Sequence, residues 1–377
     1  MKKRMKNSLL IPFLCGVLLL NVTGAFAQNK TTARYKVFLG NDPNVEYIGR
    51  TAQNNGSVSF DWTGVHLRTQ VTGGYLAVKI GDTRGDYYDL FVDSKLAKTF
   101  KVTRDTVVVL VSKATPAAHQ VMLYKRTEGE QGTATVYQFM TNKNGGLKKC
   151  AGTPTRKIEF IGNSITCGFG TEVTDGKAPF LPSTENSNHS YASIVSRYFN
   201  ADYHLTAHSG RGVVRNYGDK NPMSNPATTM QRLFFQTFDI NPAAEWDFSK
   251  WKPDVVVIKL GTNDLSNPAI APTEDQFVKG YLALIASVRK VYGDIPVICM
   301  TSCMSGETLY QYVQHVVKES NDKNVHFVGL MPSLLNVATD FGACMHPNYE
   351  GQKKMASILI PHLSTILGWP MTNKVVE

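Results

Sequence analysis

The chain has 377 residues, of which 42% are hydrophobic and 19% are charged. This composition is ordinary for globular proteins and excludes wholesale disorder and collagen-like repetition. At about 150 residues per domain, the length allows two domains or one large domain. The formal charge of +10 would indicate nucleic-acid binding only if the basic residues were concentrated in one segment, so their positions matter more than their number.

The first 27 residues have the pattern of a secretory signal peptide. Four basic residues precede a mostly apolar run over residues 9–20, and small residues end the segment near Ala27. A basic stretch, an apolar stretch and small residues at positions −3 and −1 predict cleavage after Ala27. Pro12 and Gly16 interrupt the apolar run, which is also too short for a membrane-spanning helix. We therefore expect export to the periplasm or the extracellular space.

The remaining basic residues are spread along the chain. The leader holds four of the 40 basic residues and no acidic ones, so the formal charge of the remaining 350 residues is +6. No later segment concentrates this excess as a nucleic-acid-binding arm would. We expect neither nucleic-acid binding nor, once the leader is removed, a membrane span.

The cysteines and histidines indicate neither a disulfide scaffold nor a metal site. Five cysteines follow the leader, so a monomer has at least one free thiol. We expect buried thiols with at most one disulfide. Cys299 and Cys303 are not followed by histidines at zinc-ligand spacing, and the other histidines form no metal-binding set.

Residues 35–140 have the pattern of a β-rich domain. Short runs recur in which apolar and polar residues alternate or β-branched residues dominate: Val65–Val71, Leu76–Ile80, Val107–Val111 and Val136–Met140. Turn sequences such as Asn55-Gly56 and Gly73-Gly74 separate them. Many short strands at this spacing predict a β-sandwich or jelly roll.

The pattern changes after residues 141–157, which contain Asn144-Gly145-Gly146 and Pro154 and have no periodicity. Beyond them, strand-like runs alternate with helix-like ones, with strands expected at 158–161, 255–260, 296–299 and 325–328 and helices near 191–199, 273–292, 309–317 and 349–367. Thr273 and Gln276 can form a capping box. This alternation predicts a parallel sheet with helices on both faces. We therefore place a β-sandwich domain at 28–150 and a three-layer α/β domain at 151–377.

Four short blocks place chemically useful groups at strand ends or loops of the predicted sheet, where active sites of such sheets lie. Ser164 follows the first strand, and Asn263 follows the strand at 255–260, where its amide can donate to an oxyanion. Gly210 and Gly212 offer backbone N–H groups, and His346 precedes the last helix. Each residue alone is more often a turn or cap residue. Their joint occurrence in one sheet carries the argument.

The order Ser, Gly, Asn and C-terminal His, in blocks that span residues 162–348, resembles that of the SGNH or GDSL-like hydrolases. The lead-in from Trp246 to Asp254, Tyr47-Ile48-Gly49-Arg50 and Phe60–Gly64 are similar to sequences of carbohydrate esterase family two, a group of exported two-domain O-acetyl esterases. The resemblance covers nearly all of the chain after the leader. It implies a β-sandwich followed by an SGNH hydrolase domain.

Carried over by position, the resemblance implies that Ser164 is the nucleophile and His346 the general base. The oxyanion would be held by the backbone N–H groups of Ser164 and Gly210 and by the side chain of Asn263, with Gly212 as the alternative glycine. No metal and no organic cofactor are implied.

Three positions depart from the family's blocks. Cys344 stands where many relatives have the Asp that orients the imidazole. We therefore expect a Ser-His dyad with a backbone carbonyl as the acceptor, with Asp340 as the alternative. Met345 replaces a Trp that often precedes the His, which puts a sugar-stacking platform there in doubt. Asn163 replaces the Asp of the Gly-Asp-Ser block, a change we expect to be tolerated because that Asp is not the proton acceptor.

The resemblance implies a serine esterase that removes O-acetyl groups from polysaccharides or oligosaccharides through an acetyl-enzyme. Acetylxylan and glucomannan are the expected substrate types, with acetyls on primary, C6-type hydroxyls favoured. Two alternatives stay open. One is an SGNH esterase with another acyl substrate, such as peptidoglycan O-acetyl, aryl or lipid esters. The other is a non-catalytic glycan-binding relative, because the orienting Asp is missing.

Overall fold

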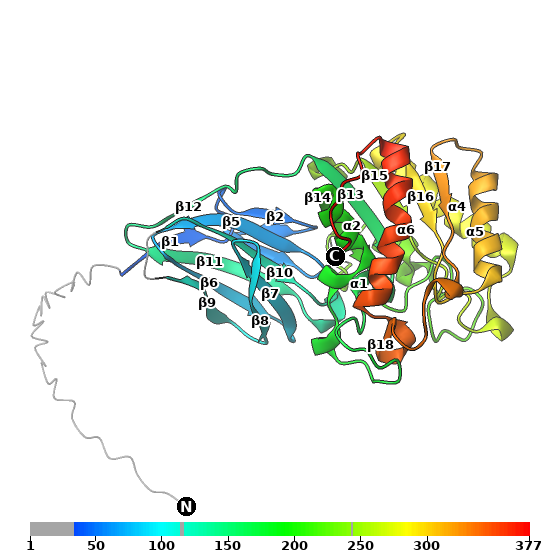
Figure 1. The fold of residues 1–377 in the computed structure, drawn as a ribbon, viewed down its shortest axis with the longest axis horizontal. Coiled ribbons are helices and arrows are strands. Elements are labelled where there is room, and N and C mark those ends of the chain that lie inside the picture. The colour runs from blue at the N-terminus through cyan, green and yellow to red at the C-terminus, as the bar shows by residue number, and fades with distance from the viewer. Residues whose placement is uncertain (1–33, 114–116, 243) are drawn as a thin grey trace, which may run out of the picture. The chain divides into compact units, whose positions relative to one another are not determined.

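The computed structural model of the chain describes residues 34–113, 117–242 and 244–377. Residues 35–377 form one compact unit (Figure 1). The predicted signal peptide, residues 1–27, lies outside the described residues. Within the described ranges, no helix combines the length and the apolar character needed to cross a membrane.

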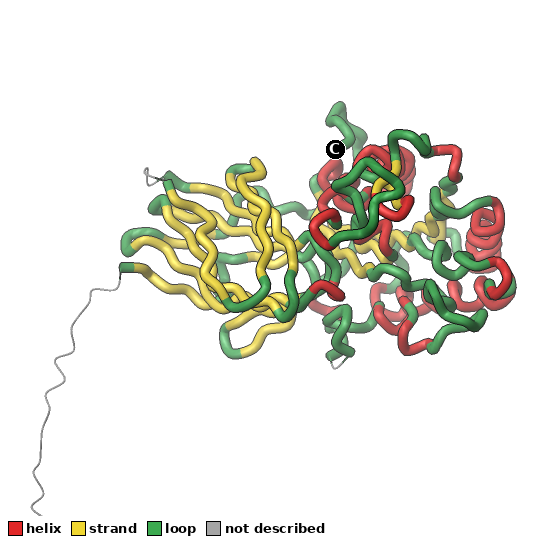
Figure 2. Tube along the Cα trace, turned by 90° about the horizontal axis from the view of Figure 1, so that it is seen from below, coloured by secondary structure: helices red, strands yellow, loops and turns green. Residues whose placement is uncertain are grey.

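The strands between residues 35 and 148 form two antiparallel sheets, drawn yellow in Figure 2. The first sheet has the order β3 (Ala52–Asn54), β4 (Ser57–Phe60), β11 (Ala134–Asn142), β6 (Tyr75–Asp82) and β9 (Thr106–Ser112), with β1 (Tyr35–Leu39) paired to β11. The second has the order β12 (Gly146–Lys148), β5 (His66–Thr72), β10 (His119–Lys125), β7 (Asp86–Val92) and β8 (Lys95–Val102), with β2 (Glu46–Ile48) paired to β5. The predicted β-rich sandwich is confirmed.

The sandwich core follows from the alternation in the sequence, because successive side chains of a strand point to opposite faces. Leu76, Val78 and Ile80 of β6 are fully buried. Sequence reasoning missed β8, whose residues are mostly exposed and include three lysines. Strand β8 lies at the edge of its sheet, where lysines discourage pairing with other chains.

The second part of the chain has a parallel sheet with the order β14 (Ala201–Ala207), β13 (Arg156–Gly162), β15 (Val255–Ile258), β16 (Val297–Met300) and β17 (Val325–Val328). Helices α2 (Tyr191–Phe199) and α6 (Tyr349–Leu367) pack on one face, and α4 (Glu274–Tyr292) and α5 (Glu307–Ser320) on the other (Figure 1). The short elements are α1 (Ser164–Cys167), α3 (Met230–Leu233), β18 (Phe341–Gly342) and β19 (His346–Pro347). The predicted three-layer α/β arrangement is confirmed.

Helix α4 begins where the sequence predicts. The Thr273 hydroxyl accepts the backbone N–H of Gln276, and the Gln276 side chain accepts the backbone N–H of Thr273. This reciprocal capping satisfies two donors that a helix start leaves without intrahelical partners. The apolar side of α4, including Phe277, Tyr281 and Leu284, is fully buried against the sheet.

The order of the parallel strands fixes where a site can form. The chain runs from β13 outward to β14 and then returns to place β15 on the other side of β13. A crevice opens at the carboxyl ends of the strands where the strand order reverses in this way. Ser164 follows β13 and Asn263 lies beyond β15, so both lie at this switch point.

The sandwich and the α/β part share a buried ion pair. Arg50, in the loop after β2, donates to a carboxylate oxygen of Glu159 on β13 at 2.7 Å, and both side chains are at most 1% exposed. Arg50 also donates to the backbone carbonyls of Phe234 and Gln236 at 2.5 and 2.8 Å. Four aromatic rings surround the guanidinium at 5.3 to 5.9 Å: Trp62, Phe234, Trp246 and Phe248. The apolar core of the sandwich is continuous with that around α4.

Replacement of Arg50 by Met is expected to lower the free energy of unfolding by about 3–5 kcal/mol, because it leaves Glu159 as an unpaired buried charge. Chemical denaturation measures this loss. Lys279→Met is the control, since Lys279 pairs with Asp275 on the surface and such pairs contribute about 0–1 kcal/mol. Equal losses of unfolding free energy in the two variants would contradict the conclusion that the buried Arg50–Glu159 ion pair stabilises the fold.

Candidate active site

The structure brings Ser164 and His346 together, although 182 residues separate them. The Ser164 Oγ lies 2.8 Å from the His346 Nε2. Ser164 begins α1 directly after β13, and a Cβ at Gly162 would lie 2.1 Å from the Thr166 Oγ1, so this turn requires glycine. The Asn163 side chain caps α1 by accepting the N–H of Ile165 at 3.3 Å. Asparagine thus supplies the cap acceptor that an Asp at this position would supply.

A backbone carbonyl holds the imidazole of His346. The His346 Nδ1 lies 3.1 Å from the carbonyl oxygen of Cys344, which can only accept, so the proton is on Nδ1 and the lone pair of Nε2 faces Ser164. The Asp340 carboxylate is used elsewhere and binds the N–H of Asn336, the Thr339 hydroxyl and Lys354. The geometry therefore favours the carbonyl over Asp340 as the acceptor.

The loop before His346 has an unusual backbone. Cys344 and Met345 have φ values of 51° and 56°, in the left-handed region that non-glycine residues seldom adopt. Their N–H groups donate to the carbonyls of Ala178 and Gly176 at 3.0 and 2.9 Å. These two hydrogen bonds hold the strained turn and so fix the carbonyl that orients His346.

Two groups proposed to stabilise an oxyanion lie at the same edge of the sheet. Gly210 and Asn263 line one cleft with Ser164 and His346. The Asn263 Nδ2 donates one hydrogen to the carbonyl of Arg211 at 2.7 Å, which orients the amide and leaves its second hydrogen for a ligand. The N–H of Gly212 is donated to the Asn216 Oδ1 at 3.2 Å. The structure thus favours Gly210 over Gly212 as the second donor.

The cleft has a volume of about 1010 Å³ and an aromatic and partly polar lining. The ring centroid of Phe169 lies 4.4 Å from that of His346 and 3.9 Å from that of Phe180, on which Phe169 stacks. Tyr217 also lines the cleft and is 70% exposed, so its ring is available to a ligand. The cleft lies at the upper end of the size range of ligand sites, which is about 300–1,000 Å³.

Burial is the main cause of the shifted pKa of His346. Burial lowers the pKa of His346 to about 4, the hydrogen bond to the Cys344 carbonyl opposes this, and the charge of Lys259 adds to it. Lys259 is itself completely buried, and within the described residues its Nζ has no hydrogen-bond partner. Desolvation lowers the pKa of Lys259 to about 8. At neutral pH the imidazole is therefore free to accept a proton.

Two buried groups hold ligand-type atoms within 4.8 Å of one another: Glu128, His208 and Asp239, and Glu128, Cys167 and Glu185. In the first group, the two ring nitrogens of His208 face the Asp239 Oδ1 at 2.7 Å and the Glu130 Oε1 at 3.2 Å. The Glu128 Oε2 accepts the N–H of Ser209 at 2.6 Å. Hydrogen bonds thus already use the ligand-type atoms of the first group, and we assign no metal to it.

Among the described residues the cysteines are all free thiols. Cys167, Cys299 and Cys303 are buried, as expected, whereas Cys150 is half-buried and Cys344 is exposed. The single disulfide that the sequence allowed does not form among them.

Sequence reasoning missed two residues beside the site, Lys259 and Glu128. Lys259 stands within the apolar run 255–260, and a charge inside a buried strand is a signal that could have drawn attention to it. Glu128 carries no such signal, because its partner Ser209 is 81 residues away.

Comparison with known families agrees with this geometry. Residues 47–150 match the family described as carbohydrate esterase 2 N-terminal, and residues 160–354 match the GDSL-like lipase/acylhydrolase family. The second match alone covers more than half of the chain.

Comparison with individual proteins gives the same family. The cellulase/esterase CelE of Acetivibrio thermocellus is 34% identical over 340 residues, which cover 87% of this chain and 40% of CelE. An acetylxylan esterase/glucomannan deacetylase of Cellvibrio japonicus is 28% identical over 95% of this chain and 98% of its own. The structure of a family two carbohydrate esterase from Clostridium thermocellum, in complex with cellohexaose, has a TM-score of 0.80, 32% identity and coverage of 86% of this chain and all of its own.

A parallel sheet with a serine and a histidine in contact at its switch point, beside a glycine and an asparagine, defines a hydrolase of the SGNH class. A β-sandwich of the matching type precedes it. The chain belongs to carbohydrate esterase family two, whose members are carboxylic ester hydrolases.

The low pKa of His346 predicts activity that persists into acid solution. A general base must be neutral, so kcat/KM is expected to stay level as the pH falls and to reach half its maximum at about pH 4, instead of near 6.5. The profile of kcat/KM against pH with a soluble acetate ester measures this limb. A midpoint above pH 6 would contradict the desolvated environment described for the ring.

Replacement of Lys259 by Met is expected to stabilise the fold. The pKa of Lys259 is about 8 when folded and about 10.5 when unfolded, so its charge opposes folding by about 3 kcal/mol below pH 8, and this penalty disappears as the pH rises through 10.5. Urea unfolding at pH 6.5 and at pH 10.5 measures the difference. A loss of stability in Lys259→Met at both pH values would show that the ammonium has a partner in solution.

Proposed function

We propose that the chain is a serine esterase that removes O-acetyl groups from polysaccharides or oligosaccharides. The observation that carries this proposal is the 2.8 Å contact between the Ser164 Oγ and the His346 Nε2, in a cleft that Gly210 and Asn263 also line. Family membership and the relatives named acetylxylan esterase/glucomannan deacetylase support the substrate class.

In the proposed reaction the Ser164 Oγ attacks the acetyl carbonyl carbon while its proton passes to the His346 Nε2. The tetrahedral oxyanion is stabilised by the backbone N–H groups of Ser164 and Gly210 and by the free amide hydrogen of Asn263. The C–O bond to the sugar then breaks, and the imidazolium returns its proton to the departing sugar oxygen. Water repeats these steps on the acetyl-enzyme, which releases acetate and the free Ser164 hydroxyl.

The absence of an Asp carboxylate beside His346 is expected to affect the rate of this reaction. The Cys344 carbonyl fixes the tautomer and direction of the His346 ring but carries only a partial charge. It stabilises the imidazolium less than an Asp would, and an orienting Asp is worth up to about 10⁴-fold in a Ser-His-Asp triad. A low pKa of His346 and a modest turnover are both consistent with this arrangement.

The proposed substrate is a largely uncharged glycan such as acetylated xylan or glucomannan, with C6-type acetyls favoured. The size of the cleft and the exposed ring of Tyr217 support a polymeric sugar substrate, since aromatic faces pack against the apolar faces of sugar rings. The reaction as derived needs no cofactor.

The proposed organisation of the chain is a signal peptide at residues 1–27, a β-sandwich domain at 28–150 and a catalytic domain at 151–377. The sequence pattern of the leader supports export.

Ser164→Ala is expected to reduce acetate release from acetylated xylan, glucomannan and an activated acetate ester by at least 10³-fold, because no nucleophile remains. The wild type should prefer acetyl over butyryl esters. An unchanged rate in Ser164→Ala would overturn the serine assignment, and a wild type that releases no acetate from any of these substrates would favour a glycan-binding relative. Preference for longer acyl chains, or for peptidoglycan O-acetyl groups, would favour another esterase of the same fold.

A further inference from the structure

The connection between β10 and β11 leaves the sandwich and packs against the catalytic part of the chain. It begins at Arg126 and includes the 3₁₀ turn η1 (Gly129–Gln131). Arg126 and Glu128 are 5% and 2% exposed, which is rare for charged residues unless they are paired. The partners of these two side chains show what the connection does.

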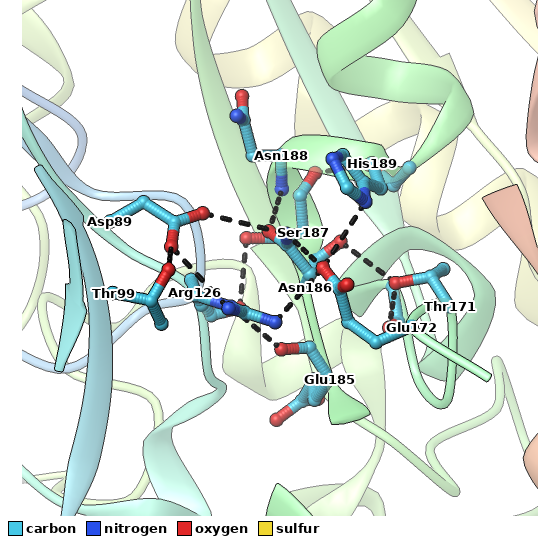
Figure 3. A network of polar contacts seen from close by, with 12 residues as sticks. Asp89, Thr99, Arg126, Thr171, Glu172, Glu185, Asn186, Ser187, Asn188 and His189 are labelled. Carbon is cyan, nitrogen blue, oxygen red and sulfur yellow. Dashed lines mark hydrogen bonds and ion pairs between the residues drawn. The ribbon is translucent and has the colours of Figure 1, made fainter. Parts of the chain in front are cut away.

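Arg126 fixes the start of the connection, as Figure 3 shows. Its guanidinium contacts Asp89 of the sandwich at 3.3 Å and Glu172 of the catalytic part at 2.9 Å. Its Nε donates to the carbonyl of Glu185 at 3.3 Å, and its own carbonyl accepts the N–H of Ser187 at 3.1 Å. Arg126 therefore holds the connection to both parts of the molecule.

The side chain of Glu128 contacts the loop at residues 208–210, called the oxyanion loop here because it carries the proposed donor Gly210. The Glu128 Oε2 accepts the backbone N–H of Ser209 at 2.6 Å, and Ser209 directly precedes Gly210. The same oxygen lies 3.6 Å from the Sγ of Cys167, the last residue of α1, which begins with Ser164. One carboxylate oxygen from the sandwich thus contacts the segments that carry the proposed nucleophile and the proposed oxyanion donor.

Glu130 contacts the same segment directly, and Gly129 contacts it through Asp239. The Glu130 Oε1 lies 3.2 Å from the Nε2 of His208, and the Asp239 Oδ1 lies 2.7 Å from the Nδ1 of that ring. The Asp239 Oδ2 in turn accepts the N–H of Gly129 at 3.2 Å. His208 and Ser209 are therefore both held by contacts that lead back to the sandwich.

A second carboxylate, Glu185, lies beside Glu128 in this buried cluster. Burial raises the pKa of Glu185 well above its usual range, and the charge of Glu128 adds to this effect. A proton on Glu185 removes the repulsion between the two buried carboxylates. The Glu128 Oε2 remains an acceptor for the N–H of Ser209, at the short distance of 2.6 Å.

We infer that Glu128 is a positioning residue for the esterase reaction, which sets the direction of the Gly210 N–H through its hydrogen bond to the N–H of Ser209. This inference rests on the proposed function. It makes the β-sandwich a part of the catalytic apparatus, because the residue that orients the oxyanion loop belongs to the sandwich.

The test compares Glu128→Ala with Glu128→Gln, whose amide oxygen can still accept the N–H of Ser209. Glu128→Ala is expected to lower kcat on an acetate ester by about 10- to 100-fold with KM within about twofold, since loss of a whole oxyanion donor costs about 10²- to 10³-fold. Glu128→Gln should stay within about fivefold of the wild type. The rate at which an activated phosphonate modifies Ser164 should fall in parallel with kcat, because the phosphonyl oxygen occupies the same donors.

Glu159→Gln is the matched control. Glu159 is a buried carboxylate that also pairs with the sandwich, through Arg50, but it has no contact with residues 208–210 among the described interactions. This variant should lower the midpoint of unfolding and leave kcat and the phosphonate rate unchanged well below that midpoint. If Glu128→Ala does not fold, Glu128→Asp takes its place, because the shorter side chain keeps the charge but cannot keep the contact.

Three outcomes would overturn the inference: wild-type kcat and phosphonate rate in folded Glu128→Ala or Glu128→Asp, a change confined to KM, or a loss of activity in Glu159→Gln as large as that in Glu128→Ala. Ser164→Ala separates this failure from that of the proposed function. If Ser164→Ala is inactive and the Glu128 variants match the wild type, only the positioning role is wrong. If Ser164→Ala retains full activity, the proposed function itself fails.

Discussion

The reversal of strand order at β13 is the constraint on which the site depends. Because β14 and β15 lie on opposite sides of β13, the segments that follow these three strands must meet at one edge of the sheet. Ser164, Gly210 and Asn263 come from those three segments and need no long loops to reach one another. Only His346 arrives from a distance, on a turn held by hydrogen bonds to the loop at residues 176–178.

The sandwich and the α/β part differ in architecture but do not behave as separate bodies. Arg50 pairs with Glu159 in a fully buried position, and the apolar core runs from one part into the other. The connection that starts at Arg126 extends the same contact to the edge of the active site. The Arg50–Glu159 pair is thus expected to act on stability alone, whereas the connection that starts at Arg126 also contacts the segment that carries Gly210.

Much of the fold and of the candidate site could be predicted from local sequence. The capping box at Thr273 and the apolar runs at β13 and β15 depend on residues that are close together in the sequence. The same is true of the positions of Ser164 and Asn263 at strand ends. Strand β8 was not predicted because most of its residues are exposed, so its sequence lacks a regular alternation of apolar and polar residues. Glu128 escaped for another reason. Its proposed role depends on a contact with Ser209, which is 81 residues away, and no local pattern records that contact.

The turn before His346 shows how a chain can keep a function while it loses a side chain. The acceptor for the imidazole N–H is the carbonyl of residue 344, and every amino acid has that carbonyl. Its direction comes from the left-handed backbone at residues 344 and 345 and not from the cysteine side chain. The side chain of residue 344 takes no part in this hydrogen bond, and the left-handed backbone at this position favours glycine and asparagine. The backbone conformation of the turn orients the proposed base, so replacing the side chain of residue 344 need not change that orientation.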